Sequence, residues 1–270
     1  MKKLAGIFLT MTLTLSLTAG CGDAGNDAAQ ADAAAQTGSA QTETAENAVT
    51  AEVAESTESL AATEDTEADR EAEAKQLLVD LTGTYQELWP VILSDEYEQT
   101  WIDDCGALVG EDNAQAAYEK LSSMVTGEVY GEDAVEAYQN GGGAYFCGFT
   151  QGVDTVEFDG ANATISGYDA NGEELFSHTY HYIGMEDVRG LYEYMSDDAD
   201  SGEFTYFYLA PDTNDTTYHI EFRYGSDADA LTQYDAGAYA YWLASGISVD
   251  CDETMIDNCI ELFCTENLSE

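Results

Sequence analysis

The spacing of hydrophobic positions divides the chain into helical and strand-like parts. Between Leu77 and Tyr138 apolar residues recur every three or four positions, which predicts helices. From Gly143 to Gly225 they occur instead in six short segments rich in Tyr, Phe, Val and Thr, separated by Gly, Asn and Asp, which predicts six antiparallel strands. After Asp227 the helical spacing returns. Because a meander hides its edges by closing, we expect a mainly β protein: an antiparallel β-barrel flanked by α-helices at both ends.

The chain begins with a short basic region, an apolar run and Leu-Thr-Ala-Gly ahead of Cys21. This pattern is typical of a bacterial lipoprotein signal, so we expect residues 1–20 to be removed and Cys21 to be lipidated. Residues 21–76 are rich in Ala, Glu, Asp and Thr and predict an acidic disordered tether. Patches near Glu67 to Asp80, a segment that runs past the end of the tether, also favour helix. The folded domain is then expected over residues 77–270.

The formal net charge of the chain is -47, with only seven Lys and Arg residues. Such a chain cannot neutralise phosphates, so nucleic-acid binding is excluded, and direct adsorption to anionic lipid is disfavoured. We therefore expect contact with the membrane only through the lipid, on the extracellular face of the bacterial cytoplasmic membrane. The negative charge attracts cations without selecting one of them.

One predicted strand carries two metal-ligand side chains. His219 and Glu221 lie two residues apart in the segment TTYHIEFRYG. Because side chains alternate along a strand, both point to the same face. Imidazole and carboxylate are ligands of zinc, although the same spacing also occurs on ordinary solvated strands.

The order of several segments resembles the ZinT (YodA) family, exported zinc- and cadmium-binding proteins with a lipocalin-like (calycin) barrel. The segments that carry this resemblance are LTGTYQELWPVI, DTVEFDG, FTYFYLAPD and HIEFRYGSDADAL, followed by an acidic final helix. The resemblance covers the chain from about Lys75 onward. It implies a monomeric protein that captures zinc or cadmium and buffers it or delivers it to a component of a zinc ABC importer.

The resemblance also implies a metal site, but this chain departs from it. The family binds metal through three histidines; the first falls on His219, the second on Glu221 and the third on Phe207, which cannot ligate. His178 or His181 would complete the site if its strand passed near His219. These two face opposite ways, so only one can join, and we select His178. Zinc is therefore expected on His219, Glu221 and His178.

The remaining motifs leave alternatives open. Apart from Cys21 there are five cysteines, and the candidate disulfides are Cys251 with Cys259 or Cys264, and Cys105 with Cys147. No motif typical of a hydrolase is present, so we do not expect an enzyme. The alternative function is a lipocalin-like barrel that has lost metal binding and holds a small organic ligand or a protein partner.

Overall fold

The structure is a computed structural model that describes residues 66–210 and 217–269. The signal peptide, the lipidated Cys21 and the tether as far as residue 65 lie outside the described residues, and these expectations stay predictions. In the described part of the chain no helix has the length and apolar character needed to cross a membrane.

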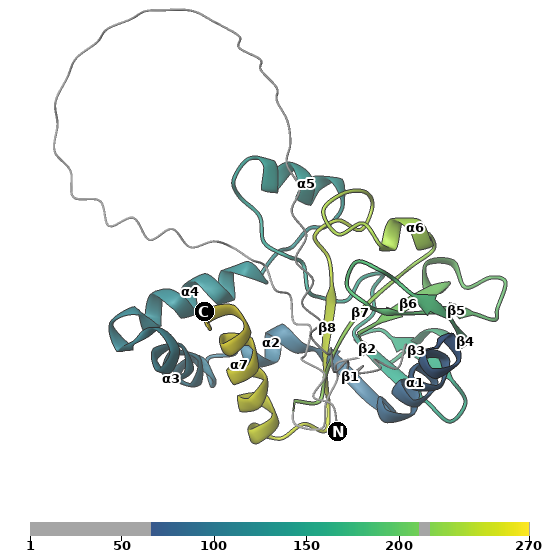
Figure 1. The fold of residues 1–270 in the computed structure, drawn as a ribbon, viewed down its shortest axis with the longest axis horizontal. Helices are drawn as coiled ribbons and strands as arrows, with labels where there is room; N and C mark the ends of the chain where they lie inside the picture. The colour runs from purple at the N-terminus through teal and green to yellow at the C-terminus, as the bar shows by residue number, and fades with distance from the viewer. Residues whose placement is uncertain (1–65, 211–216, 270) are drawn as a thin grey trace, which may run out of the picture. The chain divides into compact units, whose positions relative to one another are not determined.

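Eight antiparallel strands form a closed barrel in which each strand pairs with the next one along the chain (Figure 1). The first strand pairs with the last and closes the barrel. The strands are β1 (Gly83–Glu87), β2 (Thr155–Asp159), β3 (Thr164–Tyr168), β4 (Glu174–Met185), β5 (Tyr192–Ser196), β6 (Tyr206–Leu209), β7 (His219–Gly225) and β8 (Ala244–Ser248). The expected barrel class and its six central strands are confirmed.

The helical prediction for the two closing strands, β1 and β8, is wrong. Tyr85 and Ile247 lie in segments whose apolar spacing predicts helix, yet the structure places both in strands. The two strands are the first and the last of the barrel, and they pair with each other, for example Tyr85 with Ser248. β1 also pairs with β2 and β8 with β7, so each strand has a neighbour on both sides. A segment of five residues carries too little pattern to predict these pairings from the sequence.

Helices lie before, between and after the strands. They are α1 (Glu67–Asp80), α2 (Leu88–Ile92), α3 (Glu98–Val109), α4 (Ala114–Met124), α5 (Glu132–Gln139), α6 (Ala228–Leu231) and α7 (Glu253–Leu268), with single 3₁₀ turns at Glu111–Asn113 and Gly202–Phe204. Pro90 occupies the first turn of α2, where its missing N–H costs no helical hydrogen bond. The expected helices at both ends of the barrel are confirmed.

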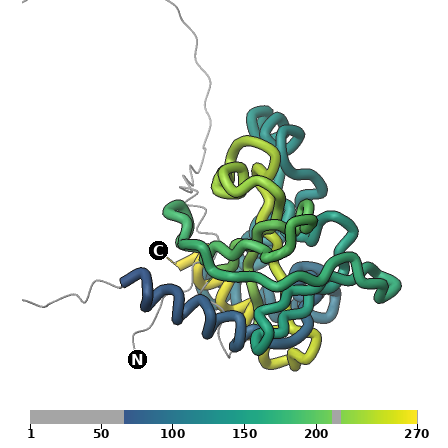
Figure 2. Tube along the Cα trace, turned by 90° about the vertical axis from the view of Figure 1, so that its right-hand side faces the viewer, coloured from purple at the N-terminus to yellow at the C-terminus, as the bar shows by residue number. Residues whose placement is uncertain are grey.

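The first helix belongs to the packed part of the chain. Thr66 and Asp69 form a capping box at its start, as the helical composition of this segment favours. The Tyr194 hydroxyl donates to the Ala74 carbonyl oxygen at 2.7 Å, and Leu77 is buried on the same side of the helix. In Figure 2, α1 is the dark blue helix beside the strands, and it contacts β2 and β4. The packed region therefore begins before the expected boundary at residue 77.

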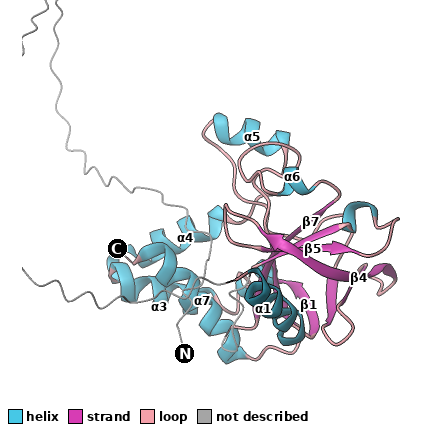
Figure 3. Ribbon diagram, turned by 45° about the vertical axis from the view of Figure 1, so that its right-hand side comes forward, coloured by secondary structure: helices cyan, strands magenta, loops and turns pink. Residues whose placement is uncertain are grey.

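Two hydrophobic cores share the barrel wall. One fills the barrel interior with aromatic side chains, including Phe207, Phe222 and Tyr224. The second lies between the helices α2, α3, α4 and α7 and the outer side of β8, where Ile247 belongs to it. Figure 3 shows α3, α4 and α7 grouped together beside the magenta strands. We call this second core, with the helices that form it, the helical layer. Strands β7 and β8 are buried throughout because both of their faces are covered.

Candidate functional site

The register of β7 decides which way its polar side chains point. Ile220 belongs to the core of the barrel interior. His219 pairs with Ile247, a member of the helical layer, and Glu221 pairs with Ser245. His219 and Glu221 therefore face out of the barrel, on one side of the strand, as their spacing predicts. Their exposed fractions are only 1% and 4%.

The imidazole of His219 is held in its neutral form. Its Nδ1 lies 2.6 Å from the Thr217 hydroxyl oxygen. Burial disfavours the protonated ring and lowers the pKa of His219 to about 4. When Nδ1 carries the proton and donates a hydrogen bond to the Thr217 hydroxyl, the metal-binding lone pair lies on Nε2. A hydrogen bond from the second ring nitrogen is the usual way in which proteins orient a metal-binding histidine.

Two thiols lie close to this face. Cys259, on α7, donates from Sγ to the Thr217 carbonyl oxygen at 3.0 Å, so the residue that orients His219 is itself held by the C-terminal helix. Burial raises the pKa of the Cys147 thiol far above its usual range, and the nearby Glu221 carboxylate raises it further. Burial likewise raises the pKa of the Cys259 thiol to about 12. At neutral pH both groups are thiols, and not the thiolates that bind metals most strongly.

The third polar side chain on this face is Arg223, and it is fully buried. Its guanidinium donates hydrogen bonds to the carbonyl oxygens of Leu231 and Tyr239 and lies 4.4 Å from the centre of the Tyr234 ring. Arg223 thus fastens the segment between β7 and β8 to the outside of the barrel. Its two terminal nitrogens donate to backbone carbonyls, which indicates a structural role.

The structure does not bring His178 to His219. His178 pairs with Ile165 on the inner side of β4, and its Nδ1 lies 2.9 Å from Asp198 Oδ2. Strand β4 is separated from β7 by β5 and β6. His181 points outward and lies 2.6 Å from Asp197 Oδ1. In the described part of the chain no three His, Cys, Asp or Glu side chains are grouped so that they could hold a metal ion.

Phe207, which the resemblance places at the third family histidine, does not share a face with His219. Phe207 pairs with Tyr224 and points into the barrel, away from His219. The backbone N–H of Ala210 donates to the Glu221 carbonyl oxygen at 2.9 Å, which continues the ladder by one residue. Ala210, which directly follows β6, therefore shares the outer face with Glu221. Its methyl side chain gives no chemical signal, and only the register identifies it.

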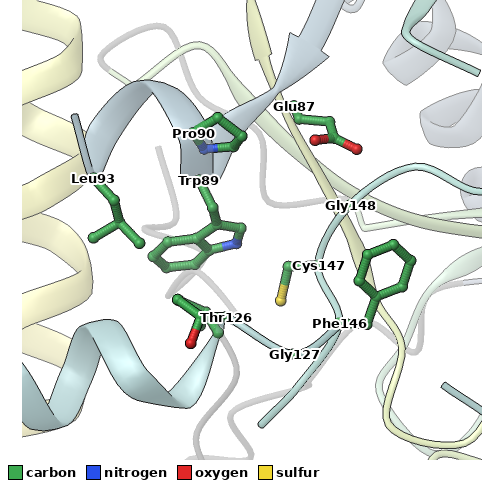
Figure 4. A pocket seen from close by; sticks show the side chains of 10 residues that line it. Glu87, Trp89, Pro90, Leu93, Thr126, Gly127, Phe146, Cys147 and Gly148 are labelled. Atoms are coloured by element: carbon green, nitrogen blue, oxygen red, sulfur yellow. The ribbon is translucent and has the colours of Figure 1, made fainter. Parts of the chain in front are cut away.

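A small pocket opens beside the same region, at α2. Figure 4 shows Trp89, Cys147 and Phe146 around it, with the Glu87 carboxylate at one side. Its volume is about 270 Å³. Glu87 accepts a hydrogen bond from the Phe149 N–H at 2.7 Å. The buried indole N–H of Trp89 makes no hydrogen bond of ordinary geometry within the described residues, although it lies near the Cys147 thiol and lowers its pKa.

Comparison with solved structures finds two zinc-bound structures from one bacterium. The Zn(II)-bound ZinT-like domain of Streptococcus pneumoniae AdcA is 15% identical, with a TM-score of 0.45, over 68% of this chain and 89% of that domain. Zn(II)-bound AdcA from the same organism is 13% identical, with a TM-score of 0.41, and the chain spans 34% of its length. The first of these is described as ZinT-like, which is the family that the sequence resembles. No family model and no curated protein sequence matches the chain.

Proposed function

We propose that this protein binds zinc through His219 and Glu221 on the outer face of β7, beneath the helical layer. The observation that carries the proposal is the state of His219: it is buried, neutral and oriented by Thr217, on the same face as a buried carboxylate. A neutral imidazole and a carboxylate are suitable zinc ligands. Water or a further side chain would complete a four-coordinate site.

The finer proposals follow from the sequence. The lipobox at Cys21 supports a lipid-anchored protein on the extracellular face of the cytoplasmic membrane, and the acidic composition supports attraction of cations toward it. There the protein would capture zinc, and also cadmium, and buffer it or deliver it to a zinc ABC importer. We propose a binding protein and not an enzyme, because only two ligands can be named and a catalytic zinc normally has three.

The second candidate function is binding of a small organic ligand. The barrel interior does not favour it, since aromatic side chains occupy that space. The pocket at α2 does, because the buried indole N–H of Trp89 lies there beside Cys147 (Figure 4). Its volume of about 270 Å³ falls just below the usual range for ligand pockets, which begins at about 300 Å³.

Zinc titration of the full chain against a competing chelator dye tests the proposal. Excess calcium should be present, because it occupies the exposed carboxylates without satisfying an imidazole ligand. We expect His219→Gln to weaken zinc binding at least about tenfold, which is a loss of roughly 1.4 kcal/mol. Glutamine keeps a hydrogen-bonding group near Thr217, so the variant removes the ligand with little change in shape.

Matched variants separate this site from the other histidines. His178→Gln and His181→Gln should leave zinc affinity unchanged, because both residues pair with surface aspartates. Glu221→Gln should weaken binding in the same direction as His219→Gln. Equal zinc binding by wild type and His219→Gln, or no binding by either, would contradict the proposal and favour the pocket at α2. Circular dichroism of each variant checks that it is folded.

A further inference from the structure

Two buried cysteines lie close together where α7 packs against α3 within the helical layer. Cys105 lies in the middle of α3 and Cys264 in the last third of α7, and these helices are in extensive contact (Figure 1). The two Sγ atoms are 3.7 Å apart, and both residues have an exposed fraction of 0%. The pair is separated by 159 positions in the sequence.

We propose that Cys105 and Cys264 form a disulfide that fastens α7 to α3. A disulfide requires sulfurs about 2.05 Å apart, so they need to approach by roughly 1.7 Å, a distance within reach of a side-chain rotation on each cysteine. Of the pairings expected from the sequence, Cys105 with Cys147 and Cys251 with Cys264 would exclude this bond, whereas Cys251 with Cys259 would not. Cys259 donates to the Thr217 carbonyl and has Cys251 as a neighbour, and the groups that affect Cys147 include Trp89, Ser245 and Glu221.

The bond would form by thiol–disulfide exchange. The thiolate of one of the two cysteines would attack an external disulfide and release one thiol from it. The other cysteine would then lose its proton and attack the protein sulfur of this mixed disulfide, which releases the second thiol. Two protein thiols are oxidised, and one small disulfide is reduced to two thiols.

Burial determines when this reaction takes place. Neither sulfur is accessible once α7 has packed, so the external disulfide reaches them during folding, before the helical layer closes. The oxidising environment outside the cytoplasm, where the signal sequence predicts that the protein folds, permits such bonds. The bond would enclose strands β2 to β8 in one covalent loop, and α7 also carries Cys259, which contacts Thr217 beside His219.

The experiment is oxidative refolding of the full chain carrying Cys21→Ala, which removes the thiol that the signal sequence assigns to the lipid. The protein is reduced and unfolded in urea, then refolded with oxidised and reduced glutathione, and free thiols are trapped by alkylation under denaturing conditions. A Glu-specific protease suits this acidic chain, and mass spectrometry without reduction identifies the linked peptides. We expect the peptides of Cys105 and Cys264 to be linked, with Cys147, Cys251 and Cys259 alkylated.

Two comparisons make the result decisive. Cys264→Ala should leave Cys105 alkylated, whereas Cys251→Ala should leave the Cys105–Cys264 link unchanged. The oxidised protein should unfold at a higher urea midpoint than the reduced protein, and the double variant Cys105→Ala, Cys264→Ala should show no such difference. Recovery of folded protein with Cys105 and Cys264 both alkylated, or linked to other cysteines, would overturn the proposal. So would a linked protein that unfolds at the same urea midpoint as the reduced one.

Discussion

The inner and outer faces of strand β7 are both buried, but against different chemistry. On the inner face, Phe222 and Tyr224 stack on Phe207 with ring centres 5.9 and 5.1 Å apart. On the outer face, His219 and Glu221 lie under the helical layer, and each polar group there needs a partner. Apolar packing on the inner face supplies stability and tolerates no ligand. The outer face has the groups that can bind one, so in this barrel the wall, and not the interior, is the place to look for function.

The largest expected effect is a loss of stability from the inner face. Phe207→Ala removes a fully buried ring that contacts Tyr180, Phe222 and Tyr224. We expect urea unfolding to show a loss of about 3–5 kcal/mol. Leu175→Ala, at a β4 position that is 43% exposed, is the control and should change stability by less than about 0.5 kcal/mol. Similar losses from both variants would mean that the interior does not dominate stability.

The second prediction concerns the pH dependence of stability that the outer face introduces. His219 has a pKa of about 4 in the folded protein, below the value of about 6.5 expected in the unfolded chain. The unfolded state therefore binds the proton first, and stability falls as pH decreases from about 6.5 to about 4. The contribution of this one group is roughly 3 kcal/mol over that range.

Urea unfolding of the metal-free protein, with a chelator present, measures this term at a series of pH values. Other acidic groups titrate in the same range, so the informative quantity is the difference between wild type and His219→Gln. As pH falls from about 6.5 toward 4, the wild type should lose more stability than His219→Gln does. Parallel curves for the two proteins would show that His219 is not buried in its neutral form.

The smallest expected effect is a change in zinc affinity when a histidine is added to the outer or to the inner face. Ala210→His adds an imidazole to the outer face next to Glu221, and we expect zinc binding to strengthen roughly tenfold, about 1.4 kcal/mol. Phe207→His adds the same group to the inner face and should not strengthen binding, because it points away from His219. Chelator competition measures both. A gain from Phe207→His without one from Ala210→His would reverse the assignment of faces derived from the register.

The local pattern of apolar residues was sufficient to predict most elements, but it failed for the two strands that close the barrel. One-sided burial can be read directly from a sequence. It explains the alternating aromatic residues of β5 and the spacing of Ala74, Leu77 and Leu78 in α1. Strands β1 and β8 show no such one-sided pattern. They become strands by pairing with each other and with β2 and β7, and no local signal indicates that β1 and β8, so far apart along the chain, are partners.

For the candidate site, the sequence shows that His219 and Glu221 share a face, because the side-chain period of a strand is two whatever the strand packs against. It cannot show that this face is the outer one, since both sides of β7 are buried and the usual polar and apolar contrast is lost. The position of His178 on the inner side of a distant strand, and the place of Ala210 beside Glu221, follow from register alone.

The sequence by itself therefore determined the class of fold, the extreme negative charge and the shared face of His219 and Glu221, because these depend on composition and local period. The tertiary structure decided which strands close the barrel, which face of β7 looks inward and which cysteines meet. Each of these is a contact between residues far apart in the chain. Such contacts are set by the packing of whole elements, and Cys105 beside Cys264 is an example that no spacing of cysteines could have indicated.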